Sequence, residues 1–186
     1  FRCDGNYLNH RSPEEVIFTT NLIDDLSRRD FTINALASDL TYTYDYFNGL
    51  QDLKDKIIKC VGNPEERFNE DALRILRAMR FASQLGFFLE LETFEAIERN
   101  KERINIITQE RITDELNKIM LSPRPSVGWN LLEKSGLLAI IFPELAALKG
   151  VETVEGRGHK DNFTHTMTVL DEVAKHSDNL WLRWAA

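Results

Sequence analysis

The sequence predicts a mainly α-helical protein, in which the tail of an α/β sheet domain precedes an all-helical region. Short β-like segments and turn signals fill residues 1–62, whereas from residue 63 onward apolar residues recur at helical spacing with only short breaks. The composition, 42% hydrophobic and 28% charged, is typical of a globular chain and excludes a disordered one.

The first part of the chain contains the predicted strands. Residues rich in Val, Ile, Thr and Tyr, bounded by turn signals, predict strands at 16–18, 40–47 and 57–61. Between the first two, residues 31–37 predict a short helix with Asp30 near its start.

The rest of the chain predicts helices. The first runs from about Glu70 to Leu85, with Gly86 just past its end. Further helices are expected at 91–100, 109–121, 127–135, 163–176 and 179–186, with a turn at 142–145. Trp129, Trp181 and Trp184 lie among leucines, which favours core packing over stacking on nucleic-acid bases.

Bulk properties narrow the function classes. A net charge of −7 argues against coating nucleic acid by overall electrostatics but allows a local basic site. Two cysteines without metal-like spacing favour a reduced, cytoplasmic protein. No apolar run approaches the roughly 20 residues of a membrane span. The chain opens without Met and closes on an apolar helical pattern, so we expect residues of importance outside it.

The stretch NPEERFNEDALRILRAMRF, residues 63–81, predicts an amphipathic helix. Its apolar side is formed by Ala72, Ile75, Leu76 and Met79. Its opposite side carries Glu70, Arg74 and Arg77, with Asp71 beside Arg74. One interpretation is a structural face of ion pairs. The other is functional, because this face uses Arg and no Lys, and guanidinium groups are flat multidentate donors suited to phosphates and base edges. Spacing alone leaves both open.

A second cluster, RRDFTIN at 28–34, also allows two interpretations. Asp30 can cap a helix while Arg28 and Arg29 form ion pairs. Alternatively the cluster is a nucleotide cradle, in which an Arg meets phosphate while Asp30 and Asn34 reach ribose hydroxyls.

Three blocks in the same order resemble one enzyme family. RRDFTINALA (28–37), the stretch from FNGLQDL to ASQLGF (47–87) and ERITDELNKIM (110–120) are similar in sequence and spacing to class II tRNA nucleotidyltransferases, which add CCA to tRNA 3′ ends. Bacterial poly(A) polymerases are close relatives. The resemblance covers roughly residues 1–148. It implies the end of a nucleotidyltransferase palm (head) at 1–62, a nucleotide-selecting helical neck at 63–122 and a helical body at 123–186.

The resemblance implies roles for individual residues. Asp71 and Arg74 would bind the Watson–Crick edge of CTP or ATP, and Glu70 would hold Arg74 in place. Asp30 would recognise the ribose, with Arg28, Arg29 and Asn34 near the sugar and triphosphate. Arg77 and Arg80 would face phosphate or tertiary carboxylates. Asn48 and Gly49 would form a hinge between head and neck, although many members have Asp before this Gly. Glu110 and Arg111 would brace the neck helices, or form an internal salt bridge.

The metal-binding acids of this family are expected outside the chain. The resemblance implies two divalent ions, taken to be Mg²⁺, held by an Asp-x-Asp pair and a third acid upstream of the segment that matches Phe1. We therefore expect this chain to select a nucleotide without transferring it.

The end of the chain carries a second resemblance. GRGHKDNFTHTMTVLDEVAKH (156–176) followed by LRWAA is similar to the start of a His-Asp phosphohydrolase domain. His165 matches the first metal-binding His of that fold, although a helix-cap or surface histidine is the simpler interpretation. One or two ligands do not hold a metal, so none is expected within the chain itself.

These observations favour a CCA-adding tRNA nucleotidyltransferase that uses CTP, ATP and tRNA. A bacterial poly(A) polymerase is the alternative within the family. A His-Asp metal-dependent phosphohydrolase and a non-catalytic RNA-binding helical module are the alternatives from other classes.

Overall fold

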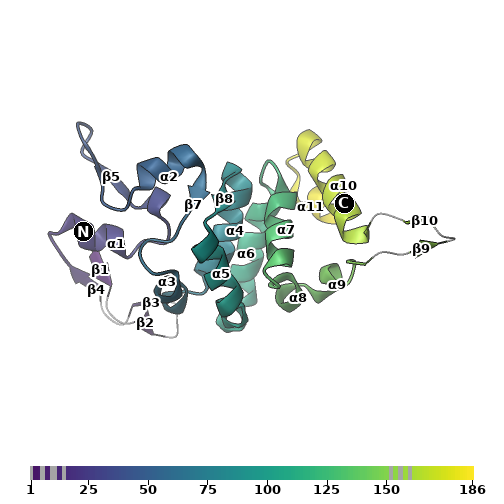
Figure 1. Cartoon of the computed structure of the whole chain (residues 1–186), viewed down its shortest axis with the longest axis horizontal. Coiled ribbons are helices and arrows are strands. Elements are labelled where there is room, and N and C mark those ends of the chain that lie inside the picture. The colour runs from purple at the N-terminus through teal and green to yellow at the C-terminus, as the bar shows by residue number, and fades with distance from the viewer. Residues whose placement is uncertain are drawn as a thin grey trace.

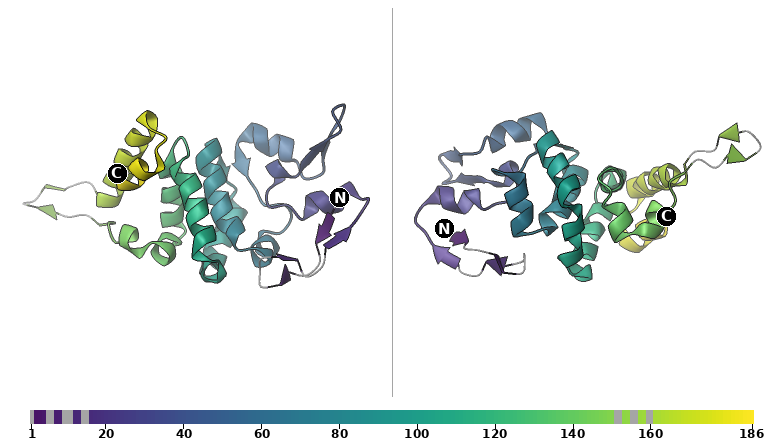
Figure 2. Two further views of the ribbon diagram at one scale, coloured as in Figure 1. Left: turned by 180° about the vertical axis from the view of Figure 1, so that it is seen from behind. Right: turned by 60° about the horizontal axis from the view of Figure 1, so that its bottom comes forward.

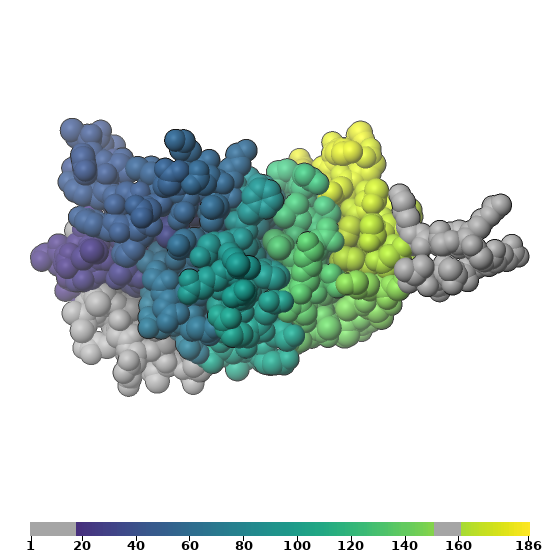
Figure 3. Space-filling view, in the orientation of Figure 1, coloured from purple at the N-terminus to yellow at the C-terminus, as the bar shows by residue number. Residues whose placement is uncertain are grey.

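Helices dominate the protein, as the sequence predicts. The computed structural model describes residues 18–150 and 161–186 in full, and the backbone alone of short strands within 2–17 and 153–158. The molecule is elongated, with the first elements at one end, α4, α6 and α7 side by side in the middle, and α10 and α11 towards the other end (Figure 1, and from two further sides in Figure 2). In the space-filling view the blue surface of the first part lies directly against the teal helices (Figure 3).

The first part holds short helices and paired strands. Its helical elements are α1 (Leu22–Ser27), the 3-10 turn η1 (Thr32–Asn34) and α2 (Gly49–Asp55). The antiparallel pairs are β1 (Arg2–Asp4) with β4 (Val16–Phe18), β2 (Tyr7–Leu8) with β3 (Ser12–Pro13), and β5 (Leu36–Ser38) with β6 (Thr43–Asp45). One parallel pair, β7 (Ile57–Ile58) with β8 (Phe88–Leu89), joins this part to the helices that follow.

Two local predictions in this part are wrong. The helix expected at 31–37 is only the η1 turn, because Phe31 is extended and bridges to Cys60, while Leu36 begins a strand of the β5–β6 hairpin. The strand expected over 40–47 is confined to β6, and a helix that the sequence did not suggest begins at Gly49. At 31–37 the long-range bridge from Phe31 to Cys60 overrides local propensity.

The second part is a succession of helices. They are α3 (Pro64–Glu70), α4 (Leu73–Leu85), α5 (Leu91–Asn100), η2 (Lys101–Ile106), α6 (Gln109–Met120), α7 (Pro125–Lys134), α8 (Leu138–Ile141), α9 (Pro143–Ala146), α10 (Asn162–His176) and α11 (Leu180–Ala185). Gly86 and Gly136 follow helices with positive φ, which an L side chain adopts at a cost. The turn expected at 142–145 is instead the short helix α9. A pair of two-residue strands, β9 (Thr153–Val154) with β10 (Arg157–Gly158), precedes α10.

The core surrounds α4. Its predicted apolar side is confirmed, because Ala72, Ile75, Leu76 and Met79 are each 0% exposed. Burial of each of the three larger side chains contributes about 1.5–3 kcal/mol. On the adjoining helix α7, Gly128 leaves room for the Ile119 side chain of α6, since an added Cβ would lie 2.6 Å from Ile119 Cγ2.

The three tryptophans differ in their exposure to solvent. Trp129 is fully buried and contacts the ring of Trp184 edge-on at 5.7 Å. Trp181 is 80% exposed, so core packing is wrong for this residue. From α11, Trp184 reaches the core beside α7, whereas Trp181 turns to solvent.

Buried Arg183 fastens α11 to the rest. Its guanidinium donates to the carbonyl oxygens of Met120 (2.7 Å) and Ser122 (2.8 Å) at the end of α6, and to that of Ala174 (3.1 Å) in α10. These donors satisfy carbonyl groups that helix ends leave without an intrahelical partner. In the described part of the chain, no helix has the length and apolarity needed to cross a membrane.

Candidate functional site

The helix expected from Glu70 to Leu85 is interrupted where the predicted base-reading residues lie. Glu70 ends α3, Asp71 is extended with φ −145° and ψ 106°, and α4 begins at Leu73. The Asp71 carboxylate accepts from the backbone N–H of Leu73 at 3.0 Å, so it takes up a donor at the start of α4. The expectation of one continuous helix is therefore wrong at this point.

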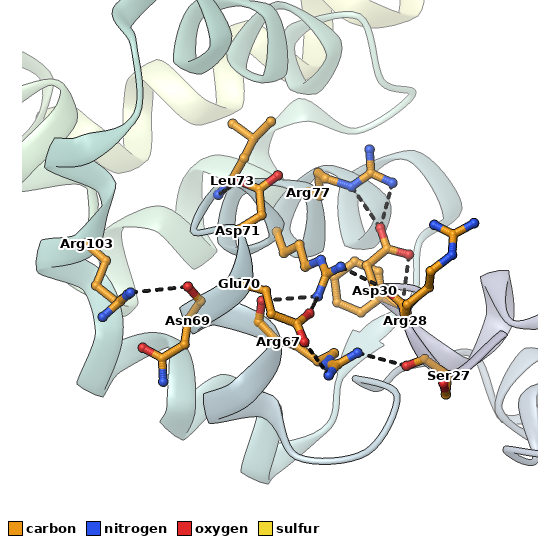
Figure 4. A network of polar contacts seen from close by, with 12 residues as sticks. Ser27, Arg28, Asp30, Arg67, Asn69, Glu70, Asp71, Leu73, Arg77 and Arg103 are labelled. Atoms are coloured by element: carbon orange, nitrogen blue, oxygen red, sulfur yellow. Dashed lines mark hydrogen bonds and ion pairs between the residues drawn. The ribbon is translucent and has the colours of Figure 1, made fainter. Parts of the chain in front are cut away.

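Glu70 lies between two arginines (Figure 4). One carboxylate oxygen accepts from Arg67 and the other from Arg74, each at 2.5 Å. The side chain of Arg74 is only 10% exposed and also donates to the carbonyl oxygens of Arg67 (3.2 Å) and Arg28 (2.8 Å). Arg67 donates in turn to the carbonyl oxygen of Ser27 at 2.8 Å. Two arginines of the α3–α4 segment thus hold consecutive carbonyl groups at the end of α1.

Asp30 is the second centre of the site. One of its oxygens accepts from the backbone N–H of Phe31 (2.9 Å) and from Asn34 Nδ2 (3.1 Å). The other accepts from Arg77 through Nε at 2.8 Å and Nη2 at 2.6 Å. Asp30 is 7% exposed, so its charge is neutralised mainly by Arg77, which lies 47 positions later in the chain. Asp30 does not cap η1, because the N-cap position of this turn is Phe31 and has no side-chain cap hydrogen bond. The ribose-binding role of Asp30 and Asn34 stays a prediction.

Arg28 and Arg29 share one carboxylate, that of Asp25. Arg28 donates to one Asp25 oxygen through Nε (3.2 Å) and Nη2 (2.5 Å), and Arg29 donates to the other at 3.1 Å. Arg29 also donates to the carbonyl oxygen of Asn34 at 2.8 Å. The two arginine side chains are 26% and 38% exposed, so each keeps a surface-accessible part.

At Arg80 and Phe81 the polar side of α4 is shielded from solvent by contacts with other parts of the protein. Arg80 pairs with Glu115 of α6 at 3.2 Å and lies over the Phe81 ring at 4.2 Å. Phe81 meets the ring of Phe31 edge-on at 5.8 Å. Burial lowers the pKa of the Arg80 guanidinium, and the charge of Glu115 opposes this shift. Both Arg77 and Arg80 therefore face tertiary carboxylates.

The predicted hinge residues are tightly held. Asn48 has φ 60°, in the left-handed region, and an added Cβ at Gly49 would lie 2.2 Å from the carbonyl oxygen of Thr32. Asp45 accepts from the backbone N–H groups of Gly49 and Leu50, each at 2.9 Å. Burial raises the pKa of Asp45, but these backbone hydrogen bonds outweigh it and hold the pKa below its ordinary value.

The remaining predicted residues lie apart from one another. Arg111 reaches Asp71 at 3.0 Å, whereas Glu110 is exposed in the first turn of α6. Arg111 thus forms an internal salt bridge, with Asp71 as its partner, and the role of Glu110 and Arg111 in bracing the neck stays a prediction. His165 is exposed on α10, and the described residues contain no group of three or more His, Cys, Asp or Glu able to hold a metal ion.

Sequence reasoning missed two residues of this network, Asp25 and Arg67. Both carried a local signal. Asp25 precedes Arg28 and Arg29 by three and four positions, and Arg67 precedes Glu70 by three, the spacings at which helical side chains meet.

The site as a whole carries excess positive charge. The arginines are Arg28, Arg29, Arg67, Arg74, Arg77 and Arg111, and the carboxylates between them are Asp25, Asp30, Glu70 and Asp71. Six cations against four anions leave two positive charges in a chain whose net charge is −7. The local field therefore favours an anionic ligand despite the acidic composition.

Comparison with known proteins identifies the class. Residues 1–59 match the family model "Poly A polymerase head domain", and residues 86–149 match "Probable RNA and SrmB-binding site of polymerase A". Together with the arginine-rich junction between these regions, these matches relate the chain to the poly(A) polymerase type of nucleotidyltransferase, a family in which divalent metal ions serve the reaction.

Individual relatives agree. The chain is 50% identical over 134 residues to the CCA-adding enzyme of Staphylococcus saprophyticus, covering 72% of the chain and 34% of that enzyme. It is 55% identical over 120 residues to the CCA-adding enzyme of Oceanobacillus iheyensis, covering 64% of the chain and 30% of that enzyme. The chain thus spans about a third of the length of the curated relatives it matches.

Solved structures give the same result. The CCA-adding enzyme of Bacillus stearothermophilus in complex with CTP matches with TM-score 0.65 and 41% identity, over 71% of this chain and 33% of that one. The Thermotoga maritima CCA-adding enzyme complexed with tRNA matches with TM-score 0.60 and 28% identity, over 72% and 32%. The chain belongs to the family of class II tRNA nucleotidyltransferases and bacterial poly(A) polymerases.

Proposed function

We propose that the protein containing this chain is a CCA-adding tRNA nucleotidyltransferase, which transfers CMP and AMP from CTP and ATP to tRNA 3′ ends. This chain supplies the part that selects the nucleotide. One observation carries the proposal: Arg74, next to Asp71, is fixed by protein partners in a chain about half identical to CCA-adding enzymes.

The arrangement of Arg74 suits it to read a base. A guanidinium has five N–H donors, and the described partners Glu70, Arg67 and Arg28 take three of them. Two donors are left for a ligand. Because their geometry is set before the ligand arrives, binding costs less side-chain entropy.

Asp71 completes the recognition. Its carboxylate has about four acceptor positions, and two described donors, Leu73 N–H and Arg111, occupy part of them. Two donors from Arg74 and an acceptor from Asp71 match the acceptors and the amino group of cytosine, and the amino group and ring acceptor of adenine. Uracil and guanine present a ring N–H in place of an acceptor, which would oppose the guanidinium donors.

The other residues are assigned to the sugar, the phosphates and the frame. Asp30 and Asn34 would bind ribose hydroxyls, and Arg28 and Arg29 the triphosphate. Glu70 would hold Arg74, while Arg77 and Arg80 would fix Asp30 and the α4–α6 contact. Asn48 and Gly49 would connect head (1–62) to neck (63–122), Arg111 with Glu110 would brace the neck, and the body would begin at 123.

The remaining partners are those of the reaction. We propose tRNA as the acceptor, Mg²⁺ as the divalent metal and the cytoplasm as the location. When bound, the metal would neutralise the triphosphate and activate the 3′-hydroxyl. The described residues gather no ligand set for it, so no step of that chemistry is assigned to them, and a metal-binding role of His165 in a longer protein stays a prediction.

The direct test is isothermal calorimetry of this chain with each of the four ribonucleoside triphosphates. We expect weak binding of CTP and ATP and weaker binding of UTP and GTP. Equal affinity for all four would refute the assignment of Asp71 and Arg74. Addition of CMP and AMP to tRNA by the longer protein would test the activity itself. The comparisons do not favour the poly(A) polymerase, phosphohydrolase or RNA-binding-module alternatives.

A further inference from the structure

The Asp25 carboxylate lies between two arginines of the site. It lies in α1, is 8% exposed, and its two oxygens face two different arginines, Arg28 and Arg29. Both arginines come from the segment just after the helix, so one turn of chain delivers the carboxylate and both cations.

The ion pairs of Asp25 restrict two long side chains. An unbound arginine samples many rotamers, and holding it in one conformation for a ligand costs entropy. Arg28 is held by two hydrogen bonds to the same Asp25 oxygen, and Arg29 by one to the other oxygen and one to the Asn34 carbonyl. The cost of ordering these arginines is therefore met during folding and not during binding.

The arginines remain available while they are held. Their side chains are 26% and 38% exposed, against 11% for Asp25. Figure 4 shows the Arg28 side chain directed away from Glu70, while the backbone carbonyl of Arg28 accepts a hydrogen bond from Arg74. Three ionised groups with one net positive charge thus present two guanidinium edges to the surface.

We propose that Asp25 is a positioning residue for triphosphate binding. It orients Arg28 and Arg29 for the phosphates without contacting the nucleotide itself. This inference rests on the proposed function, because it assigns the phosphates of the bound nucleotide to these two arginines.

The proposal and plain electrostatics predict opposite signs for one substitution. Asp25→Asn removes a negative charge near the phosphates, so a purely coulombic effect would tighten CTP binding. Loss of the two ion pairs loosens both arginines, although Arg29 keeps its hydrogen bond to the Asn34 carbonyl, so the positioning effect would weaken CTP binding. We expect about a tenfold weaker affinity for CTP, since a tenfold change corresponds to about 1.4 kcal/mol.

A matched control is available one residue earlier. Asp24 lies in the first turn of α1. Its carboxylate accepts hydrogen bonds from Thr19 Oγ1 (3.1 Å) and Asn21 Nδ2 (3.0 Å), two residues that precede the helix. Asp24→Asn makes the same change of charge without releasing either arginine. It reports the coulombic effect alone, for which we expect unchanged or slightly tighter CTP binding.

The experiment is calorimetry of the 186-residue chain and its two variants with CTP, CMP and cytidine. For Asp25→Asn we expect the loss to be largest with CTP, smaller with CMP and absent with cytidine. A merely structural role would weaken all three ligands equally and would overturn the proposal, as would CTP affinity equal to or tighter than that of the wild type. Asp25→Glu, which keeps the charge, should restore part of the CTP affinity if Asp25→Asn unfolds.

The wild-type chain separates this proposal from the proposed function. If it binds CTP no better than cytidine, the assignment of the phosphates to Arg28 and Arg29 fails, and the proposed site fails with it. If it prefers CTP, and Asp25→Asn preserves that preference, only the role of Asp25 is refuted.

Discussion

Arg74→Lys is expected to reduce base selection while preserving the charge of the site. Arginine brings five N–H donors, of which three engage Glu70 and the carbonyl groups of Arg67 and Arg28. Lysine has three N–H donors, all on one nitrogen atom. If the ammonium satisfies the same protein partners, none is left for the base, and its geometry does not support a bidentate contact.

The size of the effect follows from the bidentate hydrogen bonding that lysine does not provide. A bidentate contact to a base contributes about 1–3 kcal/mol of discrimination, which corresponds to a roughly fivefold to 150-fold change in the CTP-to-UTP affinity ratio. Glu70 remains paired with Arg67 at 2.5 Å in the variant, so no carboxylate is left without a cation. We therefore expect the melting temperature to fall only slightly.

Competition binding with CTP, ATP, UTP and GTP measures the affinity ratios. Arg99→Lys is the control, because Arg99 is a half-exposed arginine of α5 that pairs with Glu65 at 2.7 Å away from the Glu70–Arg74 network. It makes the same chemical change and should leave the ratios alone. An Arg74→Lys variant that prefers CTP over UTP as strongly as the wild type would refute the base-reading role of Arg74.

Two further predictions concern stability. Gly49→Ala should destabilise the fold by about 2 kcal/mol or more, since the new Cβ would meet backbone atoms of Thr32 at 2.2 and 2.9 Å; Gly150→Ala, where nothing lies within 4 Å, is the control in thermal unfolding, and equal melting temperatures would contradict the clash. Burial raises the pKa of the Cys60 thiol from 9.0 to about 12, so the unfolded chain deprotonates first as the pH rises through this window. Below pH 9 the full contribution of the thiol to the free energy of unfolding is present. Above pH 9 this contribution decreases by about 1.4 kcal/mol per pH unit, until the pH reaches the pKa of the thiol in the folded state. The free energy of unfolding in urea should fall more steeply from about pH 8 to about pH 10.5 for the wild type than for Cys60→Val; parallel curves would show that Cys60 does not contribute.

The helices after residue 70 were largely predictable. Their apolar periodicity, the glycines after α4 and α7, and the proline at the start of α7 are local signals of where helices begin and end, whereas α9 was expected as a turn. The break at Asp71 was not predictable in this way. It follows from the Asp71 carboxylate turning to the Leu73 amide and to Arg111, a residue 40 positions later.

In the first part of the chain, pairing with other segments overrides the local signals. Residues 31–37 have helical local preferences, yet Phe31 pairs with Cys60 and Leu36 with Asp45. Those partners are distant or in the opposite strand of a hairpin, and their hydrogen bonds outweigh the small differences in helix propensity.

By itself the sequence determined the chemical inventory: the Glu-Asp-x-x-Arg spacing, the Arg-Arg-Asp cluster, and the helical body with a buried apolar side on α4. Only the tertiary structure decided which charges meet. Arg77 with Asp30, Arg74 with the Arg28 carbonyl, and Arg111 with Asp71 join positions 40 or more apart. The physical reason is that several arginines and carboxylates of similar local spacing were available, and burial made the particular pairing decisive. A charge removed from water requires a partner at hydrogen-bond distance, and the packing of the first part of the chain against α3 and α4 determines which partner that is.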